Sequence, residues 1–223
     1  RGVNIGFLSK NGLVGGRVQA VANEFLHTWP GGCLATCGLR NTGPACESAG
    51  EYHPLHGRIG GMPAELVTVS VEPELDRLVI RGQMRESALF GHHLLLQRTI
   101  EIPLSGSSIT WQDTVRNQAA EPEPLFLLYH FNFGYPFLSP ALRLYFPPSQ
   151  VIPRTAEAEK GLAEFDQITA PIDGCPEQVF FHLPMAGTPA AEVRLVNPQL
   201  GVTVRLTYLT AELPVLTQWK SMK

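Results

Sequence analysis

Alternation of apolar and polar side chains from residue 65 onward is the feature that most constrains the fold. In segment 65–71, Leu66, Thr68 and Ser70 alternate with three valines. A period of two places successive side chains on opposite faces of a β-strand. Further strand-like segments follow, separated by turn-forming residues, at 78–85, 93–102, 108–117 and 124–133. Long strands joined by short turns predict an antiparallel meander.

The rest of the chain predicts more strands and little helix. Strands are expected at 142–146, 178–183, 192–197 and 202–209. A helix is expected at 156–165, and a turn or two of helix within 18–29. The predicted fold class is all-β, a large antiparallel β-sandwich with at most one or two short peripheral helices.

Domain organisation follows from the length and from what interrupts the chain. The sequence has 223 residues and contains no long linker, no repeat and no low-complexity tract. We therefore expect one domain over 1–223. The sequence starts without an initiator methionine and stops in a strand-like segment at Trp219–Lys223. From this we expect the domain to lack its native N- and C-terminal ends.

Polar residues interrupt the predicted strands and bear on where a ligand could lie. If the sheet has one face in water, these residues line that face, and a concave sheet turns them into a polar groove. They are Arg98, Glu101, Gln112, Asp113, Arg116 and Asn117.

Composition narrows the range of partners. Hydrophobic residues make up 44% of the chain and charged residues 17%, which is enough apolar surface for a core. The net charge of −3 gives no electrostatic reason to expect nucleic acid or an anionic membrane as a partner. The sequence contains no run of about 20 apolar residues, so it predicts no membrane-spanning helix. A small neutral or weakly charged molecule suits such a surface better.

The cysteines and the absent motifs argue against a bound cofactor. The four cysteines, Cys33, Cys37, Cys46 and Cys175, form no Cys-x-x-Cys pair, so a zinc site is disfavoured. Free thiols in a reducing cytoplasm are the simpler interpretation, and we expect a cytoplasmic protein. The sequence also contains no phosphate loop and no dinucleotide-binding fingerprint, and no cofactor is expected.

The segment 52–59 is the first candidate for a functional site. It places two histidines and Arg58 within six residues, together with Pro54 and Gly57. Gly57 relieves steric restriction beside His56, and Pro54 stiffens the entry, so the segment predicts a shaped loop. Loops on rigid scaffolds often carry binding and catalysis. A histidine in a loop is nevertheless more often structural, so this cluster alone leaves both interpretations open.

A second polar cluster lies within 126–136. On a β-strand, His130 and Asn132 share one face, whereas Tyr129 and Phe131 lie on the other. If the aromatic rings enter the core, His130 and Asn132 point into a groove. The alternative is a strand whose polar side is simply solvated, and the residues alone do not decide between the two.

These two clusters together resemble a known superfamily. Leu55-His56-Gly57 resembles a motif of the aldose 1-epimerases, the galactose mutarotases, and residues 129–134 resemble their second motif, in which a histidine precedes an aromatic residue and Asn. The fuller pattern is similar to a divergent, poorly characterised branch of that superfamily. That pattern comprises residues 32–38, 55–59, 63–65, 109–113 and 129–136.

The resemblance implies both a fold and a reaction. The fold is a galactose mutarotase-like supersandwich with a sugar on one concave sheet. The reaction is an isomerisation that interconverts the α and β anomers of an aldose without a cofactor. A carboxylate removes the proton of the anomeric hydroxyl, and a histidine protonates the ring oxygen. The ring then opens and recloses on its other face.

The resemblance also implies roles for single residues. His130 matches the second-motif histidine and is the candidate acid on the ring oxygen, while His56 binds the sugar or shares that role. Arg58 would bind a hydroxyl or a carboxylate substituent. Asn132 and Trp111 are candidates for hydroxyl contacts and stacking.

The base departs from the family pattern, and this leaves alternatives. In the family the base is a glutamate on a late strand, so we expect the catalytic Glu outside residues 1–223, with Glu177 as the best internal carboxylate. Without a base, the chain would be a non-catalytic carbohydrate-binding module. A β-sandwich with no ligand is the third alternative, and it predicts that His56 and His130 lie apart or away from any cleft. The expected partner is a small sugar, and a homodimer is compatible with these properties.

Overall fold

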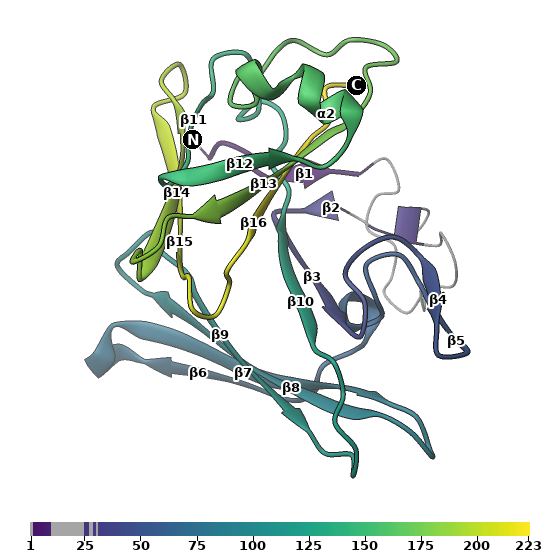
Figure 1. Cartoon of the computed structure of the whole chain (residues 1–223). Helices are drawn as coiled ribbons and strands as arrows, with labels where there is room; N and C mark the ends of the chain where they lie inside the picture. Colours follow the sequence, from purple (N-terminus) through teal and green to yellow (C-terminus); the bar gives the residue numbers. More distant parts are fainter. Residues whose placement is uncertain (1, 10–24, 27–28, 30) are drawn as a thin grey trace. The chain divides into compact units, whose positions relative to one another are not determined.

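The computed structural model describes residues 2–9, 25–26, 29 and 31–223 (Figure 1). In this part of the chain the regular elements are mostly antiparallel strands, with helix α2 (Ala156–Lys160) and short 3₁₀ turns. The chain forms two compact units. Unit 1 comprises Arg1–Phe7 and Phe133–Lys223, and unit 2 comprises Leu8–Asn132. The prediction of a single domain with trimmed ends stays a prediction.

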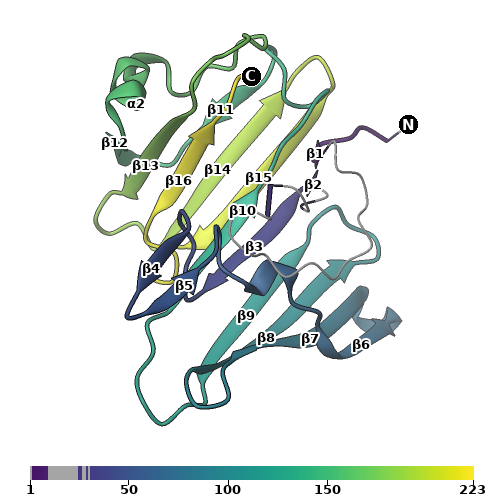
Figure 2. The same ribbon diagram turned by 90° about the vertical axis from the view of Figure 1, so that its right-hand side faces the viewer.

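A four-stranded antiparallel meander is the largest sheet of unit 2. Its strands are adjacent in sequence and in space, as Figures 1 and 2 show. This part of the meander predicted from the alternation is confirmed, since each strand lies within two residues of its expected bounds. The strands are β6 (Glu65–Glu72), β7 (Arg77–Ser87), β8 (His93–Pro103) and β9 (Thr110–Asn117).

The next strand leaves the meander, which corrects the prediction that 124–133 continues it. Strand β10 (Phe126–Phe131) instead pairs with β3 (Leu34–Leu39) in an antiparallel two-stranded sheet. Glycine permits this pairing, because a Cβ atom at Gly38 would lie 2.5 Å from the carbonyl oxygen of Phe126. The Gly, Cys and Thr content around β3 is typical of a loop in sequence, yet the segment forms a strand. Cys37 and Leu39 of this strand are buried.

Two layers of unit 2 enclose an apolar core. Leu39 comes from β3, Met84 from β7, and Leu94 and Leu96 from β8, and Ile59 joins them from the turn η1 (Ile59–Gly61). Full burial of one such side chain stabilises the fold by about 1.5–3 kcal/mol. This core fixes the strand β3 on which the candidate site is built.

The predicted wet polar face is only partly right. Arg98 and Asp113 lie opposite each other on β8 and β9, and their side chains are 17% and 1% exposed. Arg98 donates to both carboxylate oxygens of Asp113 at 2.6 and 2.8 Å and to the Thr36 hydroxyl at 2.8 Å. The Tyr129 hydroxyl donates to Asp113 at 2.6 Å. Partners from β3 and β10 therefore satisfy these polar groups inside the unit, where unpaired charges would be costly.

Unit 1 contains two three-stranded antiparallel sheets, and its predicted strands are confirmed. A cluster of buried Phe137, Leu142, Val193 and Leu195 forms its core. One sheet has the order β11 (Arg143–Tyr145), β14 (Ala190–Asn197), β15 (Val202–Leu209). The other has the order β12 (Ser149–Pro153), β13 (Gln178–Pro184), β16 (Leu216–Lys220).

The predicted helix at 156–165 is present but broken. The Thr155 hydroxyl accepts a hydrogen bond from the Ala158 amide at 3.2 Å and begins α2. The helix ends at Gly161, where a Cβ atom would lie 2.3 Å from the side chain of Gln178, and a 3₁₀ turn, η3 (Leu162–Glu164), follows. Of the helix expected within 18–29, residues 25–26 are helical and the others lie mostly outside the described residues.

No helix within the described residues is long and apolar enough to cross a membrane. All four cysteines are free thiols, and no group of His, Cys, Asp or Glu side chains among the described residues is arranged to hold a metal ion. The short elements are β1 (Phe7–Leu8), β2 (Gly31–Gly32), β4 (Cys46–Ser48), β5 (Glu51–His53) and η2 (Pro73–Leu75).

Candidate functional site

The loop that carries His56 is attached directly to β3. The Gly38 amide donates to the His56 carbonyl at 3.1 Å, and the Arg58 amide donates to the Gly38 carbonyl at 2.9 Å. Gly57 makes this close approach possible, with φ of +73°. A Cβ atom there would lie 2.1 Å from the Gly38 oxygen and 2.3 Å from the Asn41 oxygen. Only glycine fits this position, which gives a physical reason for the Leu-His-Gly sequence.

Replacing Gly57 with alanine is expected to destabilise unit 2 by about 2 kcal/mol or more, because backbone atoms must move to admit the methyl group. Gly50→Ala is the matched control. Gly50 also has positive φ, +76°, but nothing lies within 4 Å of its Cβ position. The control therefore isolates the backbone cost of about 1 kcal/mol. Chemical denaturation of both variants measures the difference, and equal losses would contradict the close contact.

Hydrogen bonds set the orientation of the His56 ring. Its backbone lies in the left-handed region, with φ of 62°, and its amide donates to the Gly43 carbonyl at 3.0 Å. Nδ1 lies 3.0 Å from the Thr42 carbonyl oxygen. Because a carbonyl only accepts, Nδ1 carries the proton, and Nε2 is the atom available for proton exchange.

Asn41 closes the turn that supplies this carbonyl. Its side-chain amide donates to the carbonyls of Pro44 and Pro54, both at 3.0 Å, and its side-chain oxygen accepts from the Gly43 amide at 3.2 Å. Asn41 and Thr42 are positioning residues that sequence reasoning missed. The turn-forming Asn-Thr-Gly-Pro sequence was a signal for the turn, but not for its contact with His56.

Strand β10 brings His130 to the same place. His130 lies opposite Ala35 of β3, so both histidines depend on one strand. The ring centroids of His56 and His130 are 5.4 Å apart, with an interplanar angle of 78°. The Phe25 ring also contacts His56, with ring centroids 4.9 Å apart. The structure thus brings together two imidazoles that are far apart in sequence.

Burial changes the acidity of His130. Desolvation, followed by the neighbouring positive charge of His56, lowers the pKa of His130 below its ordinary value near 6.5. His130 is therefore mainly neutral at neutral pH. When it is protonated, its proton is given up more easily than that of an exposed histidine.

Acidification is expected to lower the thermal stability, starting near pH 6.5. Burial lowers the pKa of His130 and also of His182 in unit 1. Below the unfolded-state pKa of about 6.5 the unfolded chain binds more protons at these groups, so stability falls with pH until the folded-state pKa values are passed. Melting temperatures measured from pH 8 to pH 5 test this. A melting temperature that rises on acidification through this window would contradict it.

Asn132 is held next to His130 and is itself buried, with 7% of its surface exposed. Its side-chain amide donates to the His130 carbonyl at 2.9 Å, and its backbone amide donates to the Cys33 carbonyl at 2.8 Å. Asn132 therefore ties the end of β10 to the segment before β3. A contact between Asn132 and a sugar hydroxyl stays a prediction.

Arg58 is engaged by protein groups. Its guanidinium lies 3.1 Å from Glu51 and 3.6 Å from Glu86, and it donates to the Tyr52 carbonyl at 2.5 Å. Glu86, which sequence reasoning missed, is 1% exposed and accepts a hydrogen bond from the Leu39 amide at 2.9 Å. These contacts connect the His56 loop to β3 and β7. Ligand binding by Arg58 stays a prediction.

The two remaining predicted residues, Trp111 and Glu177, make contacts within their own units. The Trp111 ring packs against Phe131, with centroids 6.4 Å apart. Phe131 is adjacent to His130 on a strand, so it points to the opposite face. Glu177 lies in unit 1, where it accepts a hydrogen bond from the Trp219 indole at 2.9 Å. Its part in the site stays a prediction.

Comparison with a solved structure defines the class of protein. The chain is similar to a crystal structure described as that of a "putative aldose 1-epimerase" from Klebsiella pneumoniae subsp. pneumoniae MGH 78578, with a TM-score of 0.84 and 28% sequence identity. The similarity covers 91% of this chain and 53% of that chain, so the present chain spans about half the length of that protein. No curated protein matches the chain.

The fold and this similarity place the chain in the aldose 1-epimerase superfamily, and the predicted all-β galactose mutarotase-like sandwich is confirmed as its fold class. Within that class, residues 1–223 match the model of one family. The chain belongs to the family described as "Domain of unknown function (DUF4432)".

Proposed function

We propose that the protein is an aldose 1-epimerase-like enzyme that interconverts sugar anomers. The observation that carries the proposal is the 5.4 Å separation of the His56 and His130 rings, which two different elements hold against the same strand. Ring opening of a hemiacetal needs a group that protonates the ring oxygen within hydrogen-bond reach. Histidine suits this role because its charge changes near neutral pH.

The two histidines have different surroundings and so different proposed roles. His130 is partly buried, and its lowered pKa makes its imidazolium a good proton donor to the ring oxygen. His56 has its Nδ1 fixed by the Thr42 carbonyl, which directs Nε2 toward a hydrogen bond with the sugar. Because the turn and β3 fix both rings before a sugar arrives, little reorganisation is needed at the reaction step.

The general base is proposed to be a carboxylate that no arginine already holds. Arginines hold several acidic side chains of unit 2, among them Asp113 by Arg98, and Glu51 and Glu86 by Arg58. Asp113 in particular is needed where it is, because it is the only carboxylate among the described residues that pairs with the Arg98 guanidinium. The candidates proposed from the sequence are Glu177 and a glutamate outside residues 1–223.

Those same ion pairs favour one alternative function, a non-catalytic carbohydrate-binding module. If no carboxylate reaches the anomeric hydroxyl, the histidine pair can hydrogen-bond a sugar without opening its ring. The alternative predicts saturable sugar binding and no acceleration of anomer exchange.

Exchange spectroscopy on the full-length protein distinguishes these functions. NMR magnetisation transfer between the α and β anomeric protons measures the exchange rate on a panel of neutral, acidic and phosphorylated aldoses. We expect exchange above the buffer rate, in proportion to enzyme concentration, for at least one sugar. Saturation-transfer contacts without faster exchange would indicate the binding module. Neither signal on any sugar would overturn both functions.

A further inference from the structure

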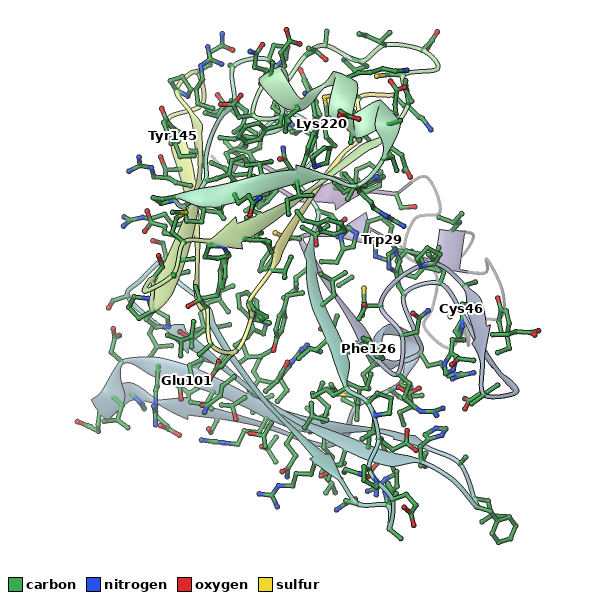
Figure 3. All side chains as sticks on the ribbon, viewed as in Figure 1. Trp29, Cys46, Glu101, Phe126, Tyr145 and Lys220 are labelled. Carbon is green, nitrogen blue, oxygen red and sulfur yellow. The ribbon has the colours of Figure 1, made fainter. Side chains whose placement is uncertain are left out.

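A shallow hollow of about 450 Å³ lies on the sheet β11–β14–β15 of unit 1, and the proposed function does not use it. Tyr145, which is labelled in Figure 3, comes from β11. The strand positions that alternate with the lining residues, such as Leu195 and Val204, pack into the core of unit 1. The hollow is therefore on the outer face of this sheet. Its lining residues are Tyr145, Arg194, Val196, Thr203 and Arg205.

Two of the lining residues are arginines that lie side by side on adjacent strands. Arg194 of β14 is the register partner of Arg205 of β15, and both residues are exposed. Like charges in directly opposed positions of antiparallel strands destabilise a sheet. Within the described residues no carboxylate forms an ion pair with either guanidinium, although Glu192 lies two positions from Arg194 on the same face. The sheet thus concentrates positive charge that the protein itself does not neutralise.

The surrounding groups fix one of these guanidiniums and add a hydroxyl. The Arg194 guanidinium carbon lies 4.8 Å from the centroid of the Tyr145 ring, its neighbour in register on β11. A guanidinium stacked on a ring keeps its N–H donors at its edge, where they can reach a ligand. Thr203, two positions from Arg205, brings a hydroxyl to the same hollow. The site therefore offers donors and positive charge, and its side chains provide no carboxylate acceptor.

We propose that this hollow binds a phosphate group, either as inorganic phosphate or as the phosphate of a small phosphomonoester. Two guanidinium forks match the oxygens of a tetrahedral dianion, and charge-assisted hydrogen bonds of this kind are stronger than neutral ones. Binding would also relieve the repulsion between Arg194 and Arg205. The volume leaves room for several atoms of the molecule that carries the phosphate. All its residues belong to unit 1, whereas the histidine pair belongs to unit 2.

Ligand-dependent stability of the full-length protein tests the proposal. Melting temperatures are measured with sodium phosphate, with glycerol 3-phosphate, and with sodium chloride at the same ionic strength and pH. For the wild type, either phosphate compound at ten times its Kd should raise the melting temperature by about 3–6 °C relative to chloride. Inorganic phosphate acting alone or better indicates the free ion, and stronger protection by glycerol 3-phosphate indicates a phosphomonoester.

The variants make the test specific to the opposed pair. In Arg205→Gln the shift should disappear, while the melting temperature in chloride should stay the same or rise, because repulsion is removed. Arg154→Gln is the control, since Arg154 is an exposed arginine of unit 1 outside this hollow and should keep the shift. Equal protection of wild type and Arg205→Gln, or no protection of the wild type by either compound, would overturn the proposal.

Discussion

Replacing His130 with alanine is expected to slow anomer exchange by about 10²–10⁴-fold, since this is the usual contribution of a positioned acid or base. The loss corresponds to about 2.7–5.4 kcal/mol of transition-state stabilisation. NMR magnetisation transfer at saturating sugar measures it. His130 is partly buried against His56, so alanine also removes packing. His130→Asn, which restores volume and polarity without proton transfer near neutral pH, should be as slow as alanine and closer to wild type in stability.

A second histidine of unit 2 supplies the control for this prediction. His93 lies on β8 and forms a hydrogen bond of 2.7 Å with Arg85, outside the pair. His93→Ala should keep the rate within a few-fold of wild type. If His130→Asn keeps the wild-type rate, His130 is not the acid. If both His130 variants fail to fold, as judged by circular dichroism, its role is structural, and His56→Asn becomes the decisive variant for the site.

The dependence of the rate on pH adds an independent check. Because burial lowers the pKa of His130, the fraction of its acid form in the free enzyme falls as pH rises through values below about 6.5. The kcat/KM of the wild type should therefore decline as pH rises, with a midpoint below about pH 6.5. The slower His130→Asn variant should lack this decline, whereas a merely structural histidine would leave the profile unchanged in shape.

Local patterns predicted most of the strands because they act over a few residues. Strand β7 was expected from the alternation around Leu78–Arg85, and no distant contact was needed to place it. The partner of β10 was a different matter. Its pairing with β3 depends on the close approach at Gly38, about ninety residues away, which no local pattern contains. The sequence therefore predicted the strand and missed its neighbour.

The candidate site divides in the same way. His56 and His130 could be selected because their motifs resemble those of a superfamily. The residues that hold them could not, since Asn41 acts through the Thr42 carbonyl and Glu86 through the Leu39 amide. Such contacts appear only when the backbone is folded. A charged residue such as Glu86 looks solvated in sequence, and its burial becomes acceptable only because an arginine and an amide meet it.

The polar residues of β8 and β9 show why contacts formed only on folding matter for assigning a role. As a wet groove, Arg98 and Asp113 would serve a ligand. As a buried pair bonded to Thr36 and Tyr129, they join the meander to the sheet β3–β10. Burial disfavours the charged form of Arg98, but the hydrogen bonds and the negative charge of Asp113 outweigh it and raise the pKa of Arg98. Burial and then the bond to Asp113 raise the pKa of Tyr129. The structure predicts a stabilising role for this group.

Asp113→Ala is expected to destabilise the protein by about 3 kcal/mol, because it removes the carboxylate to which the Arg98 guanidinium and the Tyr129 hydroxyl both donate. For a chain of this size that loss lowers the melting temperature by about 6–12 °C. Glu101→Ala removes a carboxylate from the same sheet, one that pairs with Arg77 at 3.2 Å and is 40% exposed. This control should change the free energy of unfolding by about 1 kcal/mol or less.

A double variant separates the loss of the pair from the loss of one partner. Arg98→Met combined with Asp113→Leu removes both charges and fills the space with apolar groups, so it should recover a large part of the stability lost in Asp113→Ala. Tyr129 still lacks its acceptor, which limits the recovery. Guanidinium denaturation of the three variants measures these differences. If Asp113→Ala keeps wild-type stability but weakens sugar binding, the carboxylate serves a ligand and the polar-groove interpretation is correct for this residue.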